Sequence, residues 1–220
     1  MRNNPFDNLL PWAESSGIPL SCAQREKLRL FVKELWTWQG KMNLVGVTTK
    51  NRVISELLMD SLVPLPYLPE TGRLLDLGSG GGFPAIPLKI CLPAVHFQLL
   101  EPVNRKSVFL RHIIRLLELD RIGVLSERIE ESGDRLTLCG YDTITARAVS
   151  SLHQTLEWCL PYLALGGELV TFQGCSWKKV LEESSGIMKK KGLVVSRTLP
   201  YRLPGKNAKR TILFFSKKAS

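Results

Sequence analysis

The sequence predicts an α/β protein with a Rossmann-like, mostly parallel sheet, an antiparallel last strand and an N-terminal helical extension. Three observations support this fold class. Short apolar runs alternate with helical patterns after residue 70, which indicates βαβ units. A glycine-rich turn follows the first of these runs, and the last two β-rich runs have no helix between them. The length of 220 residues suits one large domain or a domain with an appendage.

The first seventy residues predict helices and no strand. Apolar residues recur at helical spacing over 22–39, where Ser21 can cap the helix and Gly40 can end it. A second helix is expected over about 51–62, entered from Thr48 and Thr49. Three prolines between residues 64 and 69 mark a boundary. We therefore expect a helical extension at 1–70 and a sheet domain at 71–220.

The remainder of the chain alternates between expected strands and expected helices. The strands are short apolar runs, at 73–77, 95–100, 122–125, 143–149 and 168–172. The helices fill the intervals between them, at 85–91, 104–117, 152–162 and 177–190. This alternation predicts a parallel sheet covered by helices on both faces. The runs 193–199 and 211–215 predict an antiparallel pair that closes the sheet.

Composition excludes several classes of protein. No run of eighteen uninterrupted apolar residues occurs, so a membrane-spanning chain is not expected. The N-terminal segment does not resemble a secretory signal, so we expect a cytoplasmic protein. Five cysteines without CxxC spacing predict neither a disulfide framework nor a zinc site. We expect reduced thiols that mostly fill the core: Cys22, Cys91, Cys139, Cys159 and Cys175.

The net charge of +10 is concentrated at the C-terminal end. Residues 1–177 contain 18 basic and 18 acidic side chains, whereas residues 178–220 contain 12 basic and 2 acidic ones. This asymmetry favours a polyanionic partner, most often a nucleic acid, with a solvated lysine-rich surface as the alternative. Lys206, Lys209 and Arg210 lie between the last two β-rich runs, and we expect them to contact the phosphates of that partner.

The most specific local motif is RLLDLGSGGGFP at 73–84, a strand followed by a glycine-rich turn and a helix. In a doubly wound sheet a nucleotide-like cofactor binds at such a turn. A dinucleotide fingerprint that begins at Gly78 would place Phe83 where a small residue is required. The register Gly80, Gly82, Ala85 fits formally and leaves a dinucleotide open, whereas the lack of G-K-[ST] excludes a Walker phosphate loop.

Two acidic residues favour a cationic cofactor. Asp76 ends the strand beside the glycine turn, where its carboxylate would repel a pyrophosphate. The same carboxylate would favour S-adenosylmethionine, which carries an ammonium and a sulfonium but no phosphate. Glu101 ends the next strand, 21 residues after Gly80, and a carboxylate there can accept both ribose hydroxyl hydrogens. Each acid alone is compatible with a solvated loop; together with Gly80 they predict an S-adenosylmethionine site.

Several strings resemble a known family. They are GSGGGFPAIPLKI at 78–90, KMNLVG at 41–46, MDSL at 59–62, FL at 109–110, RIEE at 128–131 and YDTITARAVSSL at 141–152. Over about residues 25–175 the chain resembles the bacterial 16S rRNA guanine-N7 methyltransferases, also called glucose-inhibited division protein B. The resemblance implies a class I methyltransferase fold, S-adenosylmethionine as methyl donor, and N7 of one guanine in 16S rRNA as acceptor.

The resemblance also implies five residues that bind the donor: Gly78, Phe83, Ile129, Glu130 and Arg147. The first two would line the donor at the glycine turn, the next two would flank its adenine, and Arg147 would close the site from the fourth strand. Without the resemblance, an arginine at a strand end is more often part of a surface ion pair.

Two regions depart from the family pattern. Glu56 and Leu57 stand where the family usually has an Arg-His pair, and Gln173 stands where it usually has a lysine before glycine. Both changes remove groups that could meet RNA. Two alternatives therefore stay open, a class I methyltransferase with a non-RNA substrate and a non-catalytic RNA-binding relative.

We expect no catalytic side chain. N7 of guanine has an in-plane lone pair and no proton, so no general base is needed, and the three histidines are scattered along the chain. Rate enhancement is expected from aligning N7, the methyl carbon and the sulfur. The expected partner is 16S rRNA or the small ribosomal subunit; no metal and no membrane are expected, and the protein is expected to be a monomer.

Overall fold

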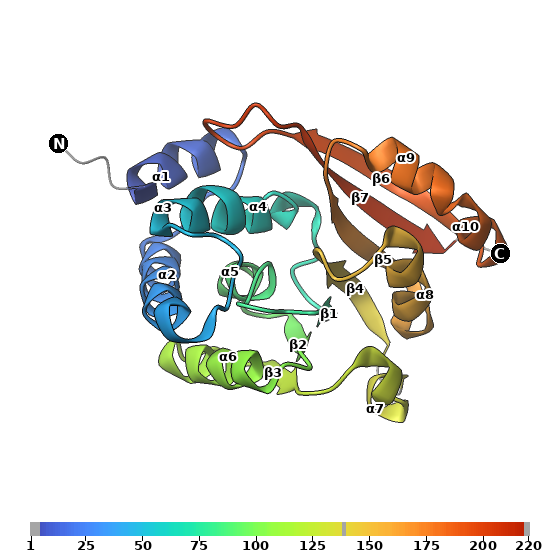
Figure 1. The fold of residues 1–220 in the computed structure, drawn as a ribbon, viewed down its shortest axis with the longest axis horizontal. Coiled ribbons are helices and arrows are strands. Elements are labelled where there is room, and N and C mark those ends of the chain that lie inside the picture. Colours follow the sequence, from blue (N-terminus) through green and yellow to red (C-terminus); the bar gives the residue numbers. More distant parts are fainter. Residues whose placement is uncertain (1–4, 138–139, 218–220) are drawn as a thin grey trace.

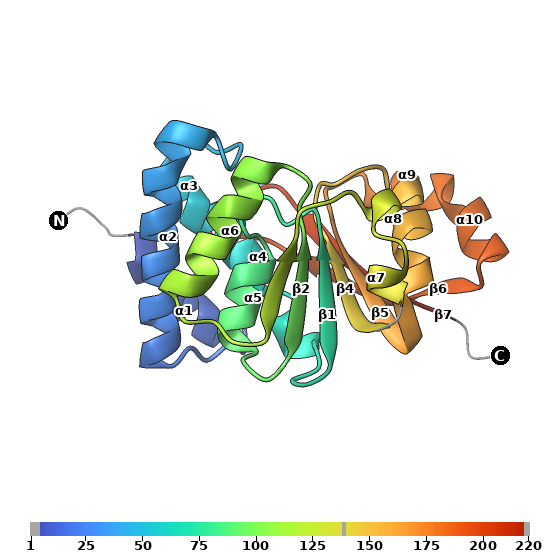
Figure 2. The ribbon, with the colours of Figure 1, turned by 90° about the horizontal axis from the view of Figure 1, so that it is seen from below.

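The computed structural model of the protein describes residues 5–137 and 140–217. A seven-stranded sheet lies between two layers of helices (Figure 1, Figure 2). The strands are β1 (Arg73–Leu77), β2 (His96–Leu100), β3 (Ile122–Leu125), β4 (Tyr141–Ala146), β5 (Leu163–Gln173), β6 (Leu193–Tyr201) and β7 (Arg210–Lys217). Their order is β3-β2-β1-β4-β5-β7-β6, and β7 is antiparallel to both of its neighbours. The predicted parallel sheet with an antiparallel last strand is confirmed.

Helices cover both faces of this sheet, as the alternating pattern predicts. On one face lie α5 (Ala85–Cys91) and α6 (Asn104–Leu116), and on the other lie α8 (Leu152–Cys159), α9 (Trp177–Glu183) and α10 (Ser185–Lys190) (Figure 2). The single helix expected over 177–190 is two helices that meet at Ser184, whose hydroxyl donates to the carbonyl of Val180. Shorter helical segments follow β3 and α8: η3 (Ile129–Glu131), α7 (Asp134–Thr137) and η4 (Leu160–Tyr162).

The N-terminal part is helical, as predicted. It consists of α1 (Pro5–Ser15), α2 (Cys22–Met42), α3 (Lys50–Arg52), η1 (Val53–Leu58), α4 (Met59–Leu62) and η2 (Leu65–Tyr67). Ser21 caps α2 by accepting the N–H of Gln24 at 3.2 Å. The expected stop at Gly40 is wrong, because α2 continues to Met42 and ends at Asn43, which has a φ of 48°.

These N-terminal helices extend the helical layer formed by α5 and α6 (Figure 2). Helix α2 packs against both of them, and its buried Leu28, Phe31 and Leu35 belong to the same apolar cluster as Phe109 of α6. A second cluster fills the opposite face of the sheet, beneath α8 and α10. The boundary at residue 70 stays a prediction, since the helices on its N-terminal side share a core with the sheet.

The cysteines only partly follow the expectation of core thiols. Cys159 is buried and Cys91 is half-buried, but Cys22 and Cys175 are exposed, so the expectation is wrong for these two. Cys139 lies outside the described residues. No helix in the described part of the chain is long and apolar enough to cross a membrane.

The strand register brings three segments together at one edge of the sheet. Leu77, the last residue of β1, pairs with Leu100 of β2 on one side and with Ala146 of β4 on the other. Since the three strands are parallel, the chain leaves all of them at the same edge. The glycine turn, Glu101 and Arg147 therefore all begin at this edge.

Candidate functional site

A cavity of about 270 Å³ lies at the carboxyl ends of β1, β2 and β4. Four residues of the predicted donor site are among those that line it: Gly78, Glu101, Ile129 and Glu130. They come from three separate connections of the sheet, which the parallel register brings together. The structure does not place the other four predicted residues, Asp76, Gly80, Phe83 and Arg147, on its lining.

Gly78 begins the turn after β1 and needs to be a glycine for two reasons. Its φ of 69° is in the left-handed region, and a Cβ there would lie 2.9 Å from Cγ2 of Val149. Its N–H donates to the carbonyl of Leu100 at 2.9 Å, as does the N–H of Ser79 at 3.1 Å. The turn is thereby attached to β2 while its backbone stays open to the cavity.

Glu101 is held in place by two backbone amides. Its Oε2 accepts the N–H of Gly80 at 2.7 Å and its Oε1 accepts the N–H of Val103 at 2.9 Å. The residue is only 3% exposed, yet it contributes to the cavity wall. Each carboxylate oxygen has a further lone pair, so both could also accept hydroxyl hydrogens of a ligand. Gly80 thus helps to orient the Glu101 carboxylate, which forms part of the cavity wall.

Asp76 lies beneath the turn. It is 1% exposed, and its Oδ1 accepts the hydroxyl of Thr145 at 2.6 Å. Its Oδ2 is buried and has no hydrogen-bond partner among the described residues. Burial raises the pKa of this carboxyl to about 6, and the hydrogen bond from Thr145 opposes part of that rise. An unpaired buried carboxylate oxygen is suited to a cation or a hydrogen-bond donor, which is consistent with the cationic ligand that the sequence predicts.

Phe83 belongs to the core. It is 7% exposed, and its ring centroid lies 5.1 Å from that of Phe31 on α2. It therefore joins the glycine turn to the N-terminal helices. Direct contact between Phe83 and a donor stays a prediction.

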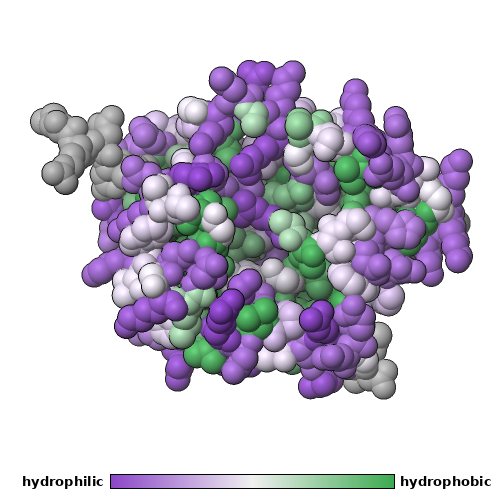
Figure 3. All heavy atoms as spheres, in the orientation of Figure 1, coloured by the Kyte–Doolittle hydropathy of each residue, from purple (hydrophilic) through white to green (hydrophobic). Residues whose placement is uncertain are grey.

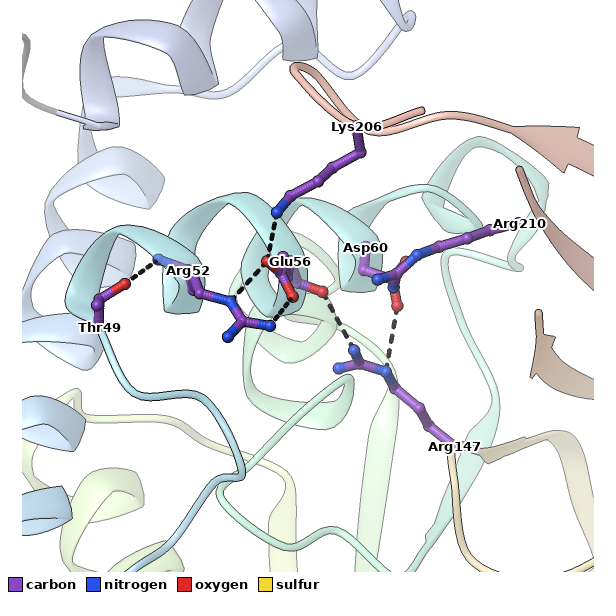
Figure 4. A network of polar contacts seen from close by, with 7 residues as sticks. All are labelled: Thr49, Arg52, Glu56, Asp60, Arg147, Lys206 and Arg210. Atoms are coloured by element: carbon purple, nitrogen blue, oxygen red, sulfur yellow. Dashed lines mark hydrogen bonds and ion pairs between the residues drawn. The ribbon is translucent and has the colours of Figure 1, made fainter. Parts of the chain in front are cut away.

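Arg147 follows β4 and reaches the N-terminal helices instead of the cavity (Figure 4). Its Nε lies 3.1 Å from Oδ2 of Asp60, and its Nη2 donates to the carbonyl of Glu56 at 3.1 Å. Asp60 is 1% exposed and accepts two further bonds on Oδ1, from Arg210 at 2.8 Å and from the hydroxyl of Tyr201 at 2.5 Å. A surface ion pair is therefore the wrong description of Arg147, which belongs to a buried network around Asp60.

Glu56, one of the departures from the family pattern, is the centre of a second group of contacts (Figure 4). Arg52 donates to both of its carboxylate oxygens, at 2.8 and 3.1 Å, and Nζ of Lys206 lies 2.7 Å from Oε1. The hydrogen bond from Arg52, with that from Lys206, lowers the pKa of Glu56 to about 2 although burial opposes the shift. Two of the three cations that we expected to contact phosphates, Lys206 and Arg210, are thus engaged within the molecule.

Several residues on the cavity wall were not predicted from the sequence, among them Lys106, Ala148 and Trp158. Lys106 lies in the first turn of α6, five residues after Glu101, and its position after β2 could have indicated it. Ala148 has a φ of 52°, unusual for alanine, and turns the chain between Arg147 and Val149. Trp158 comes from the end of α8, and no local pattern in the sequence indicates that it faces this edge.

Comparison with known proteins gives consistent results. A family model described as rRNA small subunit methyltransferase G matches residues 24–207. The ribosomal RNA small subunit methyltransferase G of Chloroflexus aggregans is 34% identical over 215 residues, which cover 97% of this chain and 90% of that protein. The counterpart of the same name in Brevibacillus brevis is 31% identical over 206 residues, which cover 92% of this chain and 87% of that one.

Solved structures show the fold. A SAM-dependent O-methyltransferase from Thermotoga maritima has a TM-score of 0.59 at 14% identity, and the match covers 86% of this chain and 72% of that chain. The sheet order and the antiparallel β7 are thus those of a class I methyltransferase.

Proposed function

The chain belongs to the rRNA small subunit methyltransferase G family, and on this premise we propose that it transfers the methyl group of S-adenosylmethionine to N7 of a guanine in 16S rRNA. The observation that carries the proposal is the cavity at the ends of β1, β2 and β4, where a fixed carboxylate, Glu101, lies beside the open backbone of Gly78. This is the edge of a doubly wound sheet at which nucleotide-like cofactors bind.

The residues of the cavity fit S-adenosylmethionine, which when bound supplies a methyl group on a positively charged sulfur. Glu101 would accept the ribose hydroxyls on its remaining lone pairs. Ile129 and Trp158 offer apolar surface for the adenine. The close approach of Gly78 to Val149 leaves the turn too narrow for a side chain and favours a ligand that contacts the backbone. The negative charge of Glu101 and Asp76 favours a cation over a pyrophosphate.

The chemistry requires little from the side chains. N7 of guanine attacks with its own lone pair and has no proton to lose, so the protein needs to align the reacting atoms and exclude other geometries. Arg147 is suited to a positioning role, because Asp60 and the carbonyl of Glu56 fix its guanidinium where the chain leaves β4. N7 lies on the edge of guanine that faces the deep, narrow major groove of an RNA helix, so the target nucleotide would be presented from a single-stranded or opened region.

We further propose that the protein acts as a cytoplasmic monomer on 16S rRNA or on the small ribosomal subunit. The basic side chains of residues 178–220 support an RNA substrate. Sedimentation of the purified protein tests the oligomeric state. Assays on protein-free 16S rRNA and on whole subunits decide which form is the substrate.

Two measurements test the proposed function. Calorimetry is expected to show binding of S-adenosylmethionine and S-adenosylhomocysteine and no binding of NAD. Transfer of a tritiated methyl group to small subunits from a strain that lacks this modification is expected to yield N7-methylguanosine on nuclease digestion. Methylation of a protein or small molecule alone would favour the non-RNA methyltransferase, and RNA binding without transfer would favour the non-catalytic relative.

A further inference from the structure

A second cavity, of about 360 Å³, opens where β5 and β6 end and β7 begins. Its lining combines cationic and aromatic side chains and contains no acidic residue: Cys175, Trp177, Pro200, Tyr201, Arg202, Lys209, Arg210 and Thr211. Figure 3 shows that hydrophilic residues cover most of one face of the molecule, with smaller apolar patches between them. We refer to the cavity lined by the eight residues from Cys175 to Thr211 given above as the β6–β7 cavity.

Two cationic side chains of the cavity are not neutralised by a partner among the described residues. Arg202 and Lys209 are exposed, and neither has an ion-pair or hydrogen-bond partner within residues 5–137 and 140–217. By contrast, Arg210 is held by Asp60, and Lys206, on the same connection, is held by Glu56. The structure thus separates the cations of this connection into a pair that fixes it to the N-terminal helices and a pair that faces solvent.

Trp177 provides a fixed apolar surface beside the two free cations. It is half-buried and packs against the apolar cluster beneath α8 and α10, which restrains its ring. The ammonium of Lys178 lies 5.7 Å from the ring centroid, a cation–π distance. An aromatic ring with cations beside it is the arrangement by which proteins bind single-stranded nucleic acid, the base stacking on the ring and the phosphate meeting the cations.

The β6–β7 cavity is also connected to the end of β4. Tyr201 and Arg210 line it and bind Oδ1 of Asp60. Figure 4 shows Arg210 and Arg147 on either side of this carboxylate, with Arg147 paired to Oδ2. The buried network around Asp60 therefore lies between this cavity and the strand end where the donor site begins.

We propose that the β6–β7 cavity binds an unpaired nucleotide of the RNA substrate, outside the target guanine, with its base against Trp177 and its phosphate between Arg202 and Lys209. The inference rests on the proposed function for the kind of RNA that is bound. It assigns to these three residues a role in holding the RNA, separate from binding of the methyl donor.

The first test removes the two free charges. The double variant Arg202→Gln, Lys209→Gln is compared with Lys189→Gln, Lys190→Gln, which removes two exposed charges from α10, before the opposite end of β6. Binding to protein-free 16S rRNA from a strain that lacks the modification is measured across a range of salt concentrations. Each lost phosphate contact lowers the slope of log affinity against log salt by about 0.7 on a single strand. Because both cations meet the same phosphate, we expect the magnitude of the slope to decrease by about 0.7 for the cavity variant and to stay unchanged for the control.

The second test addresses the ring. Trp177→Ala is expected to weaken rRNA binding about tenfold with the salt slope unchanged, because stacking involves no counterion release. Trp177→Phe, which keeps an aromatic surface, is expected to retain most of the affinity. Thermal melting checks that both variants fold; if the alanine variant does not, the salt slopes of the charge variants still decide whether the cavity binds RNA.

Failure of this inference is distinguishable from failure of the proposed function. Calorimetry with S-adenosylhomocysteine is expected to give the same affinity for all these variants and the native protein. If the native protein binds rRNA but transfers no methyl group, the proposed function is wrong while the salt slopes still test the cavity. Equal salt slopes for the cavity variant and the native protein would overturn the inference. A variant that binds protein-free rRNA normally but binds whole subunits weakly would also overturn it, because this result would indicate an acidic protein partner.

Discussion

The carboxylate of Glu101 accepts the backbone N–H of Gly80 over 2.7 Å, and this bond joins the end of β2 to the glycine turn after β1. The two residues are 21 positions apart in the sequence. The same side chain accepts the N–H of Val103, so its orientation toward the cavity is determined before any ligand binds. Preorganisation of this kind reduces the ordering cost of binding.

Glu101→Gln is expected to weaken binding of S-adenosylhomocysteine at least tenfold and to lower the free energy of unfolding by about 1–3 kcal/mol. An amide has one acceptor oxygen, so either Gly80 or Val103 would face an NH₂ group. Calorimetry and urea unfolding measure the two effects. Glu130→Gln, an exposed acid on the same cavity, serves as the control and is expected to leave stability unchanged. Native-like stability and ligand affinity in Glu101→Gln would contradict the role assigned to its carboxylate.

Asp76 is expected to make stability depend on pH. Its pKa of about 6 in the folded protein is above its ordinary value of 3.8, so between these values the folded state binds more protons than the unfolded state. The free energy of unfolding therefore decreases as pH rises from about 4 to about 6, and the destabilisation by Asp76 is constant above that range.

The comparison of native protein with Asp76→Asn isolates this effect, because the amide oxygen can still accept the Thr145 hydroxyl. The free energy of unfolding of the native protein, relative to that of the variant, is expected to fall by about 2 kcal/mol between pH 4 and pH 7. Urea unfolding at a series of pH values measures it. A difference that does not vary with pH would show that Asp76 does not titrate in this window.

Arg147→Ala is expected to affect both stability and methyl transfer. In this variant Asp60 keeps Arg210 and Tyr201 as partners, but the carbonyl of Glu56 loses its hydrogen bond. We expect the free energy of unfolding to decrease by about 1–3 kcal/mol. Methyl transfer, measured well below the melting temperature, is expected to fall at least tenfold if Arg147 orders the end of β4. Arg147→Lys keeps the charge but cannot make both contacts, so it separates charge from geometry. Full activity in the alanine variant would exclude a positioning role.

Glu56 and Lys206 are expected to be coupled only modestly. Lys206 is 40% exposed, so a double-mutant cycle with Glu56→Gln and Lys206→Gln should give about 0.2–1 kcal/mol, and less in high salt. The pKa of Glu56, about 2, is below its ordinary value of 4.5, so its stabilising effect is present above pH 4.5 and is lost on acidification toward pH 2. A coupling energy of zero at low salt would contradict a contribution of this ion pair to stability.

Features encoded within a few residues could be predicted from the sequence. The cap at Ser21, the turn at Gly78 and the strand that ends at Leu77 all depend on local geometry. The predicted end of α2 at Gly40 is wrong, and the side chain of Gln39 shows how the chain is held beyond that glycine. Its Oε1 accepts the N–H groups of Leu44 and Val45, which fixes the chain beyond the helix.

Contacts between distant segments could not be predicted. Asp60 and Arg210 are 150 positions apart, and nothing near either residue indicates the other. The segment η1 is a π-helix, whose turns are wider than those of an α-helix, and it places Glu56 beside Lys206. Its formation also depends on packing that a single sequence does not reveal. The expectation for the basic connection was therefore incomplete, since only the fold shows which cations are already paired.

The position of β7 in the sheet has a consequence for biosynthesis. This strand follows β6 in the sequence, yet it lies between β5 and β6, so β6 has no neighbour in the sheet until Arg210–Lys217 have been synthesised. Asp60 likewise acquires Tyr201 and Arg210 only after 141 and 150 further residues. While β7 has not been synthesised, the β5 edge of the sheet is therefore unpaired and the buried Asp60 lacks Arg210. The end of β6 and the start of β7, which supply Tyr201 and Arg210, complete the surroundings of Asp60, and β7 completes the sheet.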